Sequence, residues 1–151
     1  MLKNSEKSSP ISRKRIYIAG PMRGLVNWNV AAFDLAEKAW TEAGWHVFSP
    51  AAIVRAMGYA WGDSAPTEPD GNGPGSAHLK HVLNSDITCL IHSDAIALLP
   101  GWERSRGATA SSTVAQFLGL EVYDAVTMER LDPPMTPWRR VVARMETGAY
   151  R

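Results

Sequence analysis

The stretch that decides the fold is LLPGWERSRGATASSTVAQFLGL, residues 98–120. It begins with the end of an apolar run, DAIALL, residues 94–99, which is typical of a buried β-strand. A turn rich in glycine and serine follows, and we expect it to open a helix that begins with Ser111 and Ser112 and ends at Leu118. Gly119 then stands where a helix C-terminus favours glycine. Strand, turn and helix together form the repeating unit of α/β proteins.

The same alternation continues on both sides of this stretch. The predicted elements are a strand at residues 16–18, a helix at 29–43, a strand at 45–50, a helix at 77–91, a strand at 95–99, the helix just described, and a strand at 121–126. Strands that alternate with helices favour a parallel sheet covered on both faces. We therefore predict a Rossmann-like (flavodoxin-like) α/β fold with about four parallel strands in the order 2-1-3-4.

The chain of 151 residues is long enough for one domain. We expect a disordered lead-in over residues 1–13, the domain over 14–126, and a C-terminal appendage over 127–151 in which WRRVVARM is a candidate amphipathic helix. Residues 57–76 are dense in glycine, proline and aspartate. Such a long loop is either a lid over a site or an unpatterned surface excursion.

The composition argues against several classes of protein. A net charge of +1 gives no reason to expect a nucleic-acid polymer or an anionic membrane as a partner. Cys89 is the only cysteine, and His78 and His81 have no matching ligand pattern, so we expect no metal site and no cofactor. With no apolar run near the ~20 residues of a membrane span and no signal peptide, we expect a cytoplasmic protein.

Two turns rich in glycine and arginine follow predicted strands one and three: AGPMRG, residues 19–24, and LPGWERSRGA, residues 99–108. In parallel sheets, ligands bind outside the carboxyl ends of the strands. Glycine lets backbone N–H groups approach a ligand, and a helix N-terminus favours negative charge. Arg23, Ser105 and Ser111 add donors, so the turns suit a small anion such as a phosphate.

The alternative is that Gly20, Gly24 and Gly107 only serve tight turns and that Arg23 and Arg106 are solvated. The sequence contains neither GxxxxGK[ST] nor GxGxxG, which disfavours a P-loop nucleotidase and a dinucleotide enzyme.

Three further side chains are candidates for a site. Asp86 lies on or beside the apolar stripe of its helix, where an acid is rarely buried without a partner or a functional role. The alternative is that it sits at the edge of the stripe and reaches solvent or caps a neighbour. Trp28 and Trp102 each follow one of the two turns, and their rings are candidates to pack against an aromatic ligand such as a nucleobase. Asp94, at the entry of strand three, is better explained by a structural role.

The chain resembles the nucleoside 2-deoxyribosyltransferase-like superfamily, in particular its small, often phage-encoded branch. The resemblance rests on IYIAGPMRG, on DAIALLPGW with the following serine and GA, and on LGL, and it runs from about Arg15 to Val122. More distantly, the chain is similar to the 2'-deoxynucleoside 5'-monophosphate N-glycosidases, whose first turn has a comparable G-x-x-R-G.

This resemblance implies a homo-oligomer that breaks or exchanges the bond between deoxyribose and base. It implies that the turn Gly20 to Gly24, with Met22 and Arg23, lies along the sugar and phosphate of a nucleotide. It also implies that Asp86 helps to hold the sugar or base, that Ser105 contacts substrate, and that Gly107 is the turn glycine before the nucleophile.

The chain departs from the family at the nucleophile. The family pattern G-A-x-x-E places a glutamate where this chain has Ser111, and a serine has no charge with which to stabilise an oxocarbenium-like transition state. One hypothesis is an N-glycosidase or deoxyribosyltransferase that uses another acid, Asp86 or Glu103. The other is a catalytically silent protein that binds or senses a nucleotide.

Overall fold

A computed structural model describes residues 12–56 and 75–132, with side chains for 12–56 and 80–132. Residues 57–74 of the predicted loop, the WRRVVARM segment, and the predicted lead-in up to residue 11 lie outside the described residues. The elements are β1 (Arg15–Ala19), η1 (Val26–Asn29), α1 (Val30–Glu42), β2 (His46–Phe48), α2 (Pro50–Ala56), α3 (Gly75–Ile91), β3 (Ala95–Leu98), η2 (Trp102–Arg104), α4 (Arg106–Phe117) and β4 (Glu121–Asp124).

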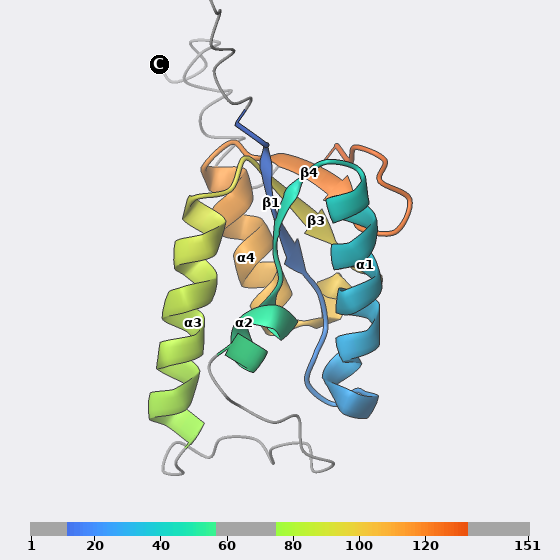
Figure 1. The fold of residues 1–151 in the computed structure, drawn as a ribbon. Coiled ribbons are helices and arrows are strands. Elements are labelled where there is room, and N and C mark those ends of the chain that lie inside the picture. Colours follow the sequence, from blue (N-terminus) through green and yellow to red (C-terminus); the bar gives the residue numbers. More distant parts are fainter. Residues whose placement is uncertain (1–11, 57–74, 133–151) are drawn as a thin grey trace, which may run out of the picture.

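The four strands form one sheet in the order β2-β1-β3-β4, and every pairing in it is parallel. Helix α1 covers one face, and α3 and α4 cover the other (Figure 1). The predicted Rossmann-like α/β fold and its strand order are therefore confirmed. The order places β1 and β3 side by side in the middle of the sheet, so the two predicted turns leave neighbouring strands.

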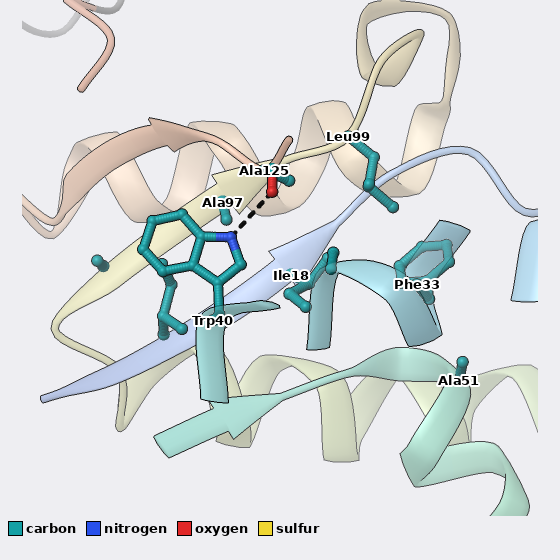
Figure 2. Close-up of a cluster of buried hydrophobic side chains, with 10 residues drawn as sticks. Ile18, Phe33, Trp40, Ala51, Ala97, Leu99 and Ala125 are labelled. Carbon is teal, nitrogen blue, oxygen red and sulfur yellow. Dashed lines mark hydrogen bonds between the residues drawn. The ribbon is translucent and has the colours of Figure 1, made fainter. Parts of the chain in front are cut away.

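Strand β1 separates the two hydrophobic layers because its side chains alternate between faces. Ile16 and Ile18 pack toward α1, whereas Tyr17 and Ala19 pack toward α3 and α4. On the α1 side, the buried Trp40 indole donates a 3.0 Å hydrogen bond from Nε1 to the Ala125 carbonyl (Figure 2). The α1 layer is thus tied to the chain that follows β4.

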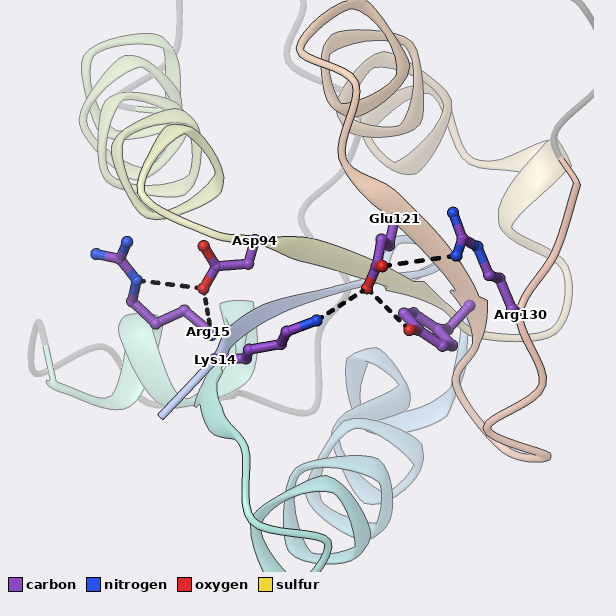
Figure 3. Close-up of polar contacts among 6 residues, drawn as sticks. Lys14, Arg15, Asp94, Glu121 and Arg130 are labelled. Carbon is purple, nitrogen blue, oxygen red and sulfur yellow. Dashed lines mark hydrogen bonds and ion pairs between the residues drawn. The ribbon is translucent and has the colours of Figure 1, made fainter. Parts of the chain in front are cut away.

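The amino ends of the strands are fixed by charged groups (Figure 3). The Arg15 backbone N–H donates to Asp94 Oδ2 at 2.7 Å, so Asp94 has the structural role that the sequence suggested. Glu121 accepts a 2.9 Å hydrogen bond from the Tyr123 hydroxyl and pairs with Lys14 and Arg130, each at 3.6 Å. Arg130 therefore holds the chain after β4 against the sheet.

Two local expectations were wrong. Helix α4 begins at Arg106 with Ser105 as its N-cap, so Ser111 and Ser112 lie in its second turn rather than at its start. Helix α2 was not predicted, because Pro50 was interpreted as the end of a strand. Proline is favoured at the first position of a helix, where its missing N–H costs nothing, and this was the overlooked signal.

Candidate functional site at the carboxyl edge

The two turns lie against each other at the carboxyl edge of the sheet. The Leu99 N–H donates to the Ala19 carbonyl at 2.8 Å, which extends the β1–β3 pairing into the turns. A Cβ on Gly20 would lie 2.7 Å from Leu99 Cβ, and one on Gly101 would lie 3.6 Å from Pro21 Cγ. Gly20 therefore permits a close approach that no other residue type would allow.

The turn after β1 leads into an unusual left-handed segment. Three consecutive residues without a glycine among them, Asn27, Trp28 and Asn29, have φ values of 45°, 56° and 59°. Asparagine tolerates this region better than most residues, but a tryptophan there is strained. The Asn29 side chain donates from Nδ2 to the Pro21 carbonyl at 2.9 Å and so ties the segment back to the turn. Trp28 is half-buried in this position.

The predicted anion-binding residues lie in the two turns at the same edge of the sheet and beside them. Arg23 is exposed, and among the described residues no hydrogen bond joins it to Ser105 or Gly107. The Ser105 hydroxyl accepts from the Ala108 N–H at 3.3 Å, which is the geometry of a helix N-cap. A Cβ on Gly107 would meet nothing within 4 Å, so this glycine is not needed for close packing.

The remaining turn residues differ in exposure. Met22 is partly buried against the α1-side core, and Trp102 is partly buried against the core on the α3 and α4 side. Glu103, by contrast, is exposed on η2. Of the two acids that the sequence proposed for chemistry, Glu103 therefore stands in solvent, whereas Asp86 is half-buried.

Asp86 lies in a polar cluster formed where β1, α3 and α4 pack together. The charge of Asp86 acts on Tyr17 of β1 and on Cys89, which follows three residues later on α3. Ser111 of α4 also acts on Tyr17, and the three elements contact one another. Tyr17 is only 2% exposed, and the Asp86 atom Oδ1 is buried without a hydrogen-bond partner among the described residues. A buried carboxylate oxygen without a donor is costly, so its place beside the two turns calls for an explanation.

The protonation of this cluster follows from its burial. Desolvation raises the pKa of Asp86 to about 6, and hydrogen bonding with Tyr17 opposes part of that rise. The pKa of Tyr17 is raised well above its usual value, first by burial and then by the charge and hydrogen bonding of Asp86, while hydrogen bonding with Ser111 lowers it. Burial and the charge of Asp86 also raise the pKa of Cys89, so its thiol stays protonated and unreactive.

The two serines of α4 that the sequence singled out have different environments. Ser111 is half-buried and interacts with Tyr17. Ser112 is buried at 1% exposure and accepts a 3.1 Å hydrogen bond from Gln116 Nε2. Ser111 therefore belongs to the candidate site, and Ser112 belongs to the helix packing.

Other features of the described surface lie away from this cluster. An open hollow of about 460 Å³ is lined by Asp34, Glu37, Lys38, Thr41, Glu42 and Arg55. None of these residues was a candidate, and Arg55 is bound there by a bidentate pair with Asp34 at 2.7 and 3.0 Å. Within the described residues, no group of three His, Cys, Asp or Glu side chains is placed to hold a metal ion. No described helix has the length and apolar character needed to cross a membrane.

Sequence reasoning missed the parts that Tyr17 and Cys89 take in the cluster. Tyr17 stands in the apolar run RIYIAG, where its ring was counted as strand core, and the ring is indeed buried. The available signal was its hydroxyl, because a buried tyrosine usually needs a hydrogen-bond partner. Cys89 is three residues after Asp86, a spacing that places both on one face of a helix.

Residues 14–124 match the model of a protein family described as a domain of unknown function, DUF4406. The match covers β1 through β4 and both turns, and so includes every candidate residue named above. Comparisons with curated proteins and with solved structures gave no match. The chain therefore belongs to the DUF4406 family.

Proposed function

We propose that the chain is a nucleoside deoxyribosyltransferase-like enzyme that breaks or exchanges the N-glycosidic bond of a (deoxy)nucleoside 5'-monophosphate, with Asp86 as its reactive acid. The observation that best supports this is the half-buried Asp86, whose pKa is about 6 and whose buried Oδ1 has no partner in the described structure. Asp86 and Ser111 both act on the pKa of the buried Tyr17, and Ser111 is the position where the resembled family places its nucleophile.

The chemistry requires an acid that is partly protonated near neutral pH. Asp86 in its protonated form would donate its proton to the leaving base as the glycosidic bond breaks. The carboxylate left behind would stabilise the cationic sugar until water attacks the anomeric carbon, and the proton released by that water would return to Asp86. Glu103 is a weaker candidate for this role because it is exposed to solvent.

The phosphate of the substrate would occupy the carboxyl edge, where the exposed Arg23 and the N-terminus of α4 both favour negative charge. Arg23→Ala should weaken the binding of a monophosphate by about 1.5–3 kcal/mol, the scale of a hydrogen bond to a charged group. Binding of the matching nucleoside should hardly change. Calorimetry with both ligands measures the difference, and equal affinities of variant and wild type for every monophosphate tested would remove Arg23 from the site.

The reaction is tested by measuring free base released from a panel of deoxynucleoside and nucleoside 5'-monophosphates at high enzyme concentration. We expect the wild type to release base from at least one of them. Loss of a general acid typically costs about 10²–10⁴ in rate, so Asp86→Asn should lose that much while Glu103→Gln retains activity. Absence of release from the whole panel would refute the enzymatic proposal.

A second function is favoured by Ser111 itself. Because this side chain carries no carboxylate, we also propose the alternative of a catalytically silent protein that binds or senses a nucleotide. In that case calorimetry detects binding by the wild type without turnover, and Ser111→Glu introduces hydrolysis by restoring the family's reactive group. A chain that neither binds nor cleaves any nucleotide in the panel would contradict both proposals.

A further inference from the structure

We propose that residues 137–145 form an amphipathic helix that docks on the exposed apolar end of α4 in the same chain. These residues contain WRRVVARM and lie beyond the described part of the chain. Three features of the molecule support this placement: the point where the described chain ends, the apolar surface beside that point, and the sequence pattern of the segment. None of the three depends on the proposed enzymatic function.

The chain after β4 turns back along the outer edge of the sheet. Arg130 forms an antiparallel bridge with Tyr123. The next residue, Leu131, donates its N–H to the Val122 carbonyl at 2.8 Å. The chain therefore runs back toward the amino end of β4, where the described residues end at Asp132.

The C-terminal end of α4 lies at this same point. Leu131 packs against the buried cluster that contains Val122 of β4 and Ala115 of α4. The Leu120 N–H donates to the Ala115 carbonyl at 2.9 Å where the chain passes from α4 into β4, so the end of the helix and the start of the strand are adjacent. Asp132 therefore leaves the described structure beside the C-terminus of α4.

Large apolar side chains are exposed at this end of α4. Phe117 is 62% exposed and Leu118 is 44% exposed. Val114, whose carbonyl accepts the Leu118 N–H at 2.9 Å, is partly buried and continues the apolar surface toward the core. Apolar residues that stand singly on a surface need no explanation, whereas a contiguous group marks a surface that another segment can cover.

The segment after Asp132 has the pattern of a helix with one apolar face. Thr136 and Pro137 form a favoured helix start, with threonine as the N-cap and proline at the first helical position. The apolar residues that follow recur at i, i+3, i+4 and i+7, which places them on one face. They are Trp138, Val141, Val142 and Met145. A helix this short is marginal alone in water, so it needs a surface against which to bury that face.

The length of the connection restricts where this helix can begin. Residues 133–136 separate Asp132 from Pro137, so five residue steps join the two. Five steps of extended chain span at most about 17 Å. Pro133 and Pro134 favour an extended chain over this distance. Because Asp132 lies beside the C-terminus of α4, the exposed end of α4 is within this reach.

The charges of the segment agree with this placement. Arg139, Arg140 and Arg144 lie outside the apolar face of the expected helix. The last turn of α4 carries no basic side chain, and the C-terminus of a helix favours positive charge. Asp132 is exposed at the same edge and adds negative charge there. Arginines that flank a docked apolar face would therefore meet a complementary surface.

Hydrogen exchange of the full-length protein tests the docking. The backbone amides of residues 138–145 should exchange slowly in the wild type. Leu118→Asp places a charge in the docking surface, so this protection should fall about 10- to 100-fold, the scale of burying one leucine side chain, while the amides of β3 stay protected. Leu35→Asp is the matched control, because it changes an exposed leucine of α1 on the other face of the sheet. Rapid exchange in the wild type, or equal protection in Leu118→Asp, would overturn the proposal.

Crosslinking gives a second measurement if Leu118→Asp fails to fold. Cys89 is the only cysteine of the chain, so a Cys89→Ser background allows cysteines to be introduced in chosen pairs. A short bismaleimide should join the cysteines of Leu118→Cys and Val142→Cys within one chain. It should not join those of Leu35→Cys and Val142→Cys. Absence of the internal link in the first pair would overturn the proposal.

Two other partners for the segment or for the surface would give different results. If a second copy of the chain supplied the segment, denaturing gels would show the crosslinked product as a dimer. A basic amphipathic helix can also lie on an anionic membrane. In that case residues 138–145 would be protected only in the presence of vesicles that contain phosphatidylserine. Either result would overturn docking within the chain.

Discussion

A carboxyl that loses part of its solvation on folding, such as that of Asp86, makes the stability of the protein depend on pH. Its pKa in the folded protein is about 6, above the ordinary value of 3.8. Between these values the folded state binds more protons than the unfolded state, so the free energy of unfolding falls as the pH rises through this window. The loss attributable to Asp86 is about 2–3 kcal/mol, complete above pH 6–7.

Asp86→Asn should remove this dependence, because asparagine does not titrate. Urea unfolding at pH 4.5 and pH 7.5 measures the free energy of unfolding of both proteins. Relative to the wild type, the variant should be more stable at pH 7.5 than at pH 4.5. If the variant and the wild type lose or gain stability in parallel between these pH values, the pKa assigned to Asp86 is wrong.

Gly20 and Gly107 provide a matched pair at the same edge of the sheet. In Gly20→Ala the new Cβ would lie 2.7 Å from Leu99 Cβ, which cannot rotate away, so the turns must separate. Overpacking of this kind costs about 1–3 kcal/mol. Gly107→Ala meets nothing within 4 Å inside helix α4 and should be neutral or stabilising by up to about 1 kcal/mol. Equal urea midpoints for the two variants would show that the turns are not in close contact.

At the scale of elements, α4 depends on its cap. Ser105 accepts from the Ala108 N–H, so Ser105→Ala should lower the free energy of unfolding by about 1 kcal/mol. Ser105→Asp supplies another capping oxygen and should retain most of that stability. Thermal or urea unfolding measures both variants. Because this cost appears without any ligand, it separates the capping role of Ser105 from a role in binding phosphate, and an unchanged stability in Ser105→Ala would argue against the cap.

The elements show where sequence patterns were informative. Helix α1 and its end were predictable because Phe33, Ala36 and Trp40 recur on one face and Gly44 follows with a φ of 95°. Helix α2 was missed because seven residues give too little periodicity to distinguish a helix from a loop. The left-handed turn at Asn27 to Asn29 has no sequence signature beyond its two asparagines, since tryptophan rarely adopts that conformation.

The candidate site was predictable only where a residue departs from the sequence pattern around it. Asp86 could be found because an acid on an apolar stripe contradicts the pattern around it. Tyr17 could not, because an aromatic residue in a strand agrees with its pattern, and its hydroxyl meets α3 and α4 only after the chain has folded. Polar contacts between elements distant in sequence leave no trace in local periodicity.

For the whole molecule, the alternation of strands and helices was enough to predict the parallel sheet and its two covered faces, and the predicted strand order was also correct. The order matters for function because it brings the turns after β1 and β3 into contact at one edge, and α3 and α4 onto one face. The expected homo-oligomer stays a prediction. Light scattering at micromolar concentration measures it, and a species of about 16.5 kDa alone would contradict it.

The measurement that tests the central claim most directly is the response of the Asp86 carboxyl resonance to nucleotides. We predict that this carboxyl titrates with a pKa of about 6 and that its resonance shifts when a deoxynucleoside 5'-monophosphate is added, but not when inorganic phosphate is added alone. The shift should occur because the ligand reaches Oδ1, the oxygen without a partner in the described structure. A carboxyl that titrates near its ordinary value, or a resonance unmoved by every nucleotide in the panel, would contradict the assignment of Asp86 to a nucleotide site.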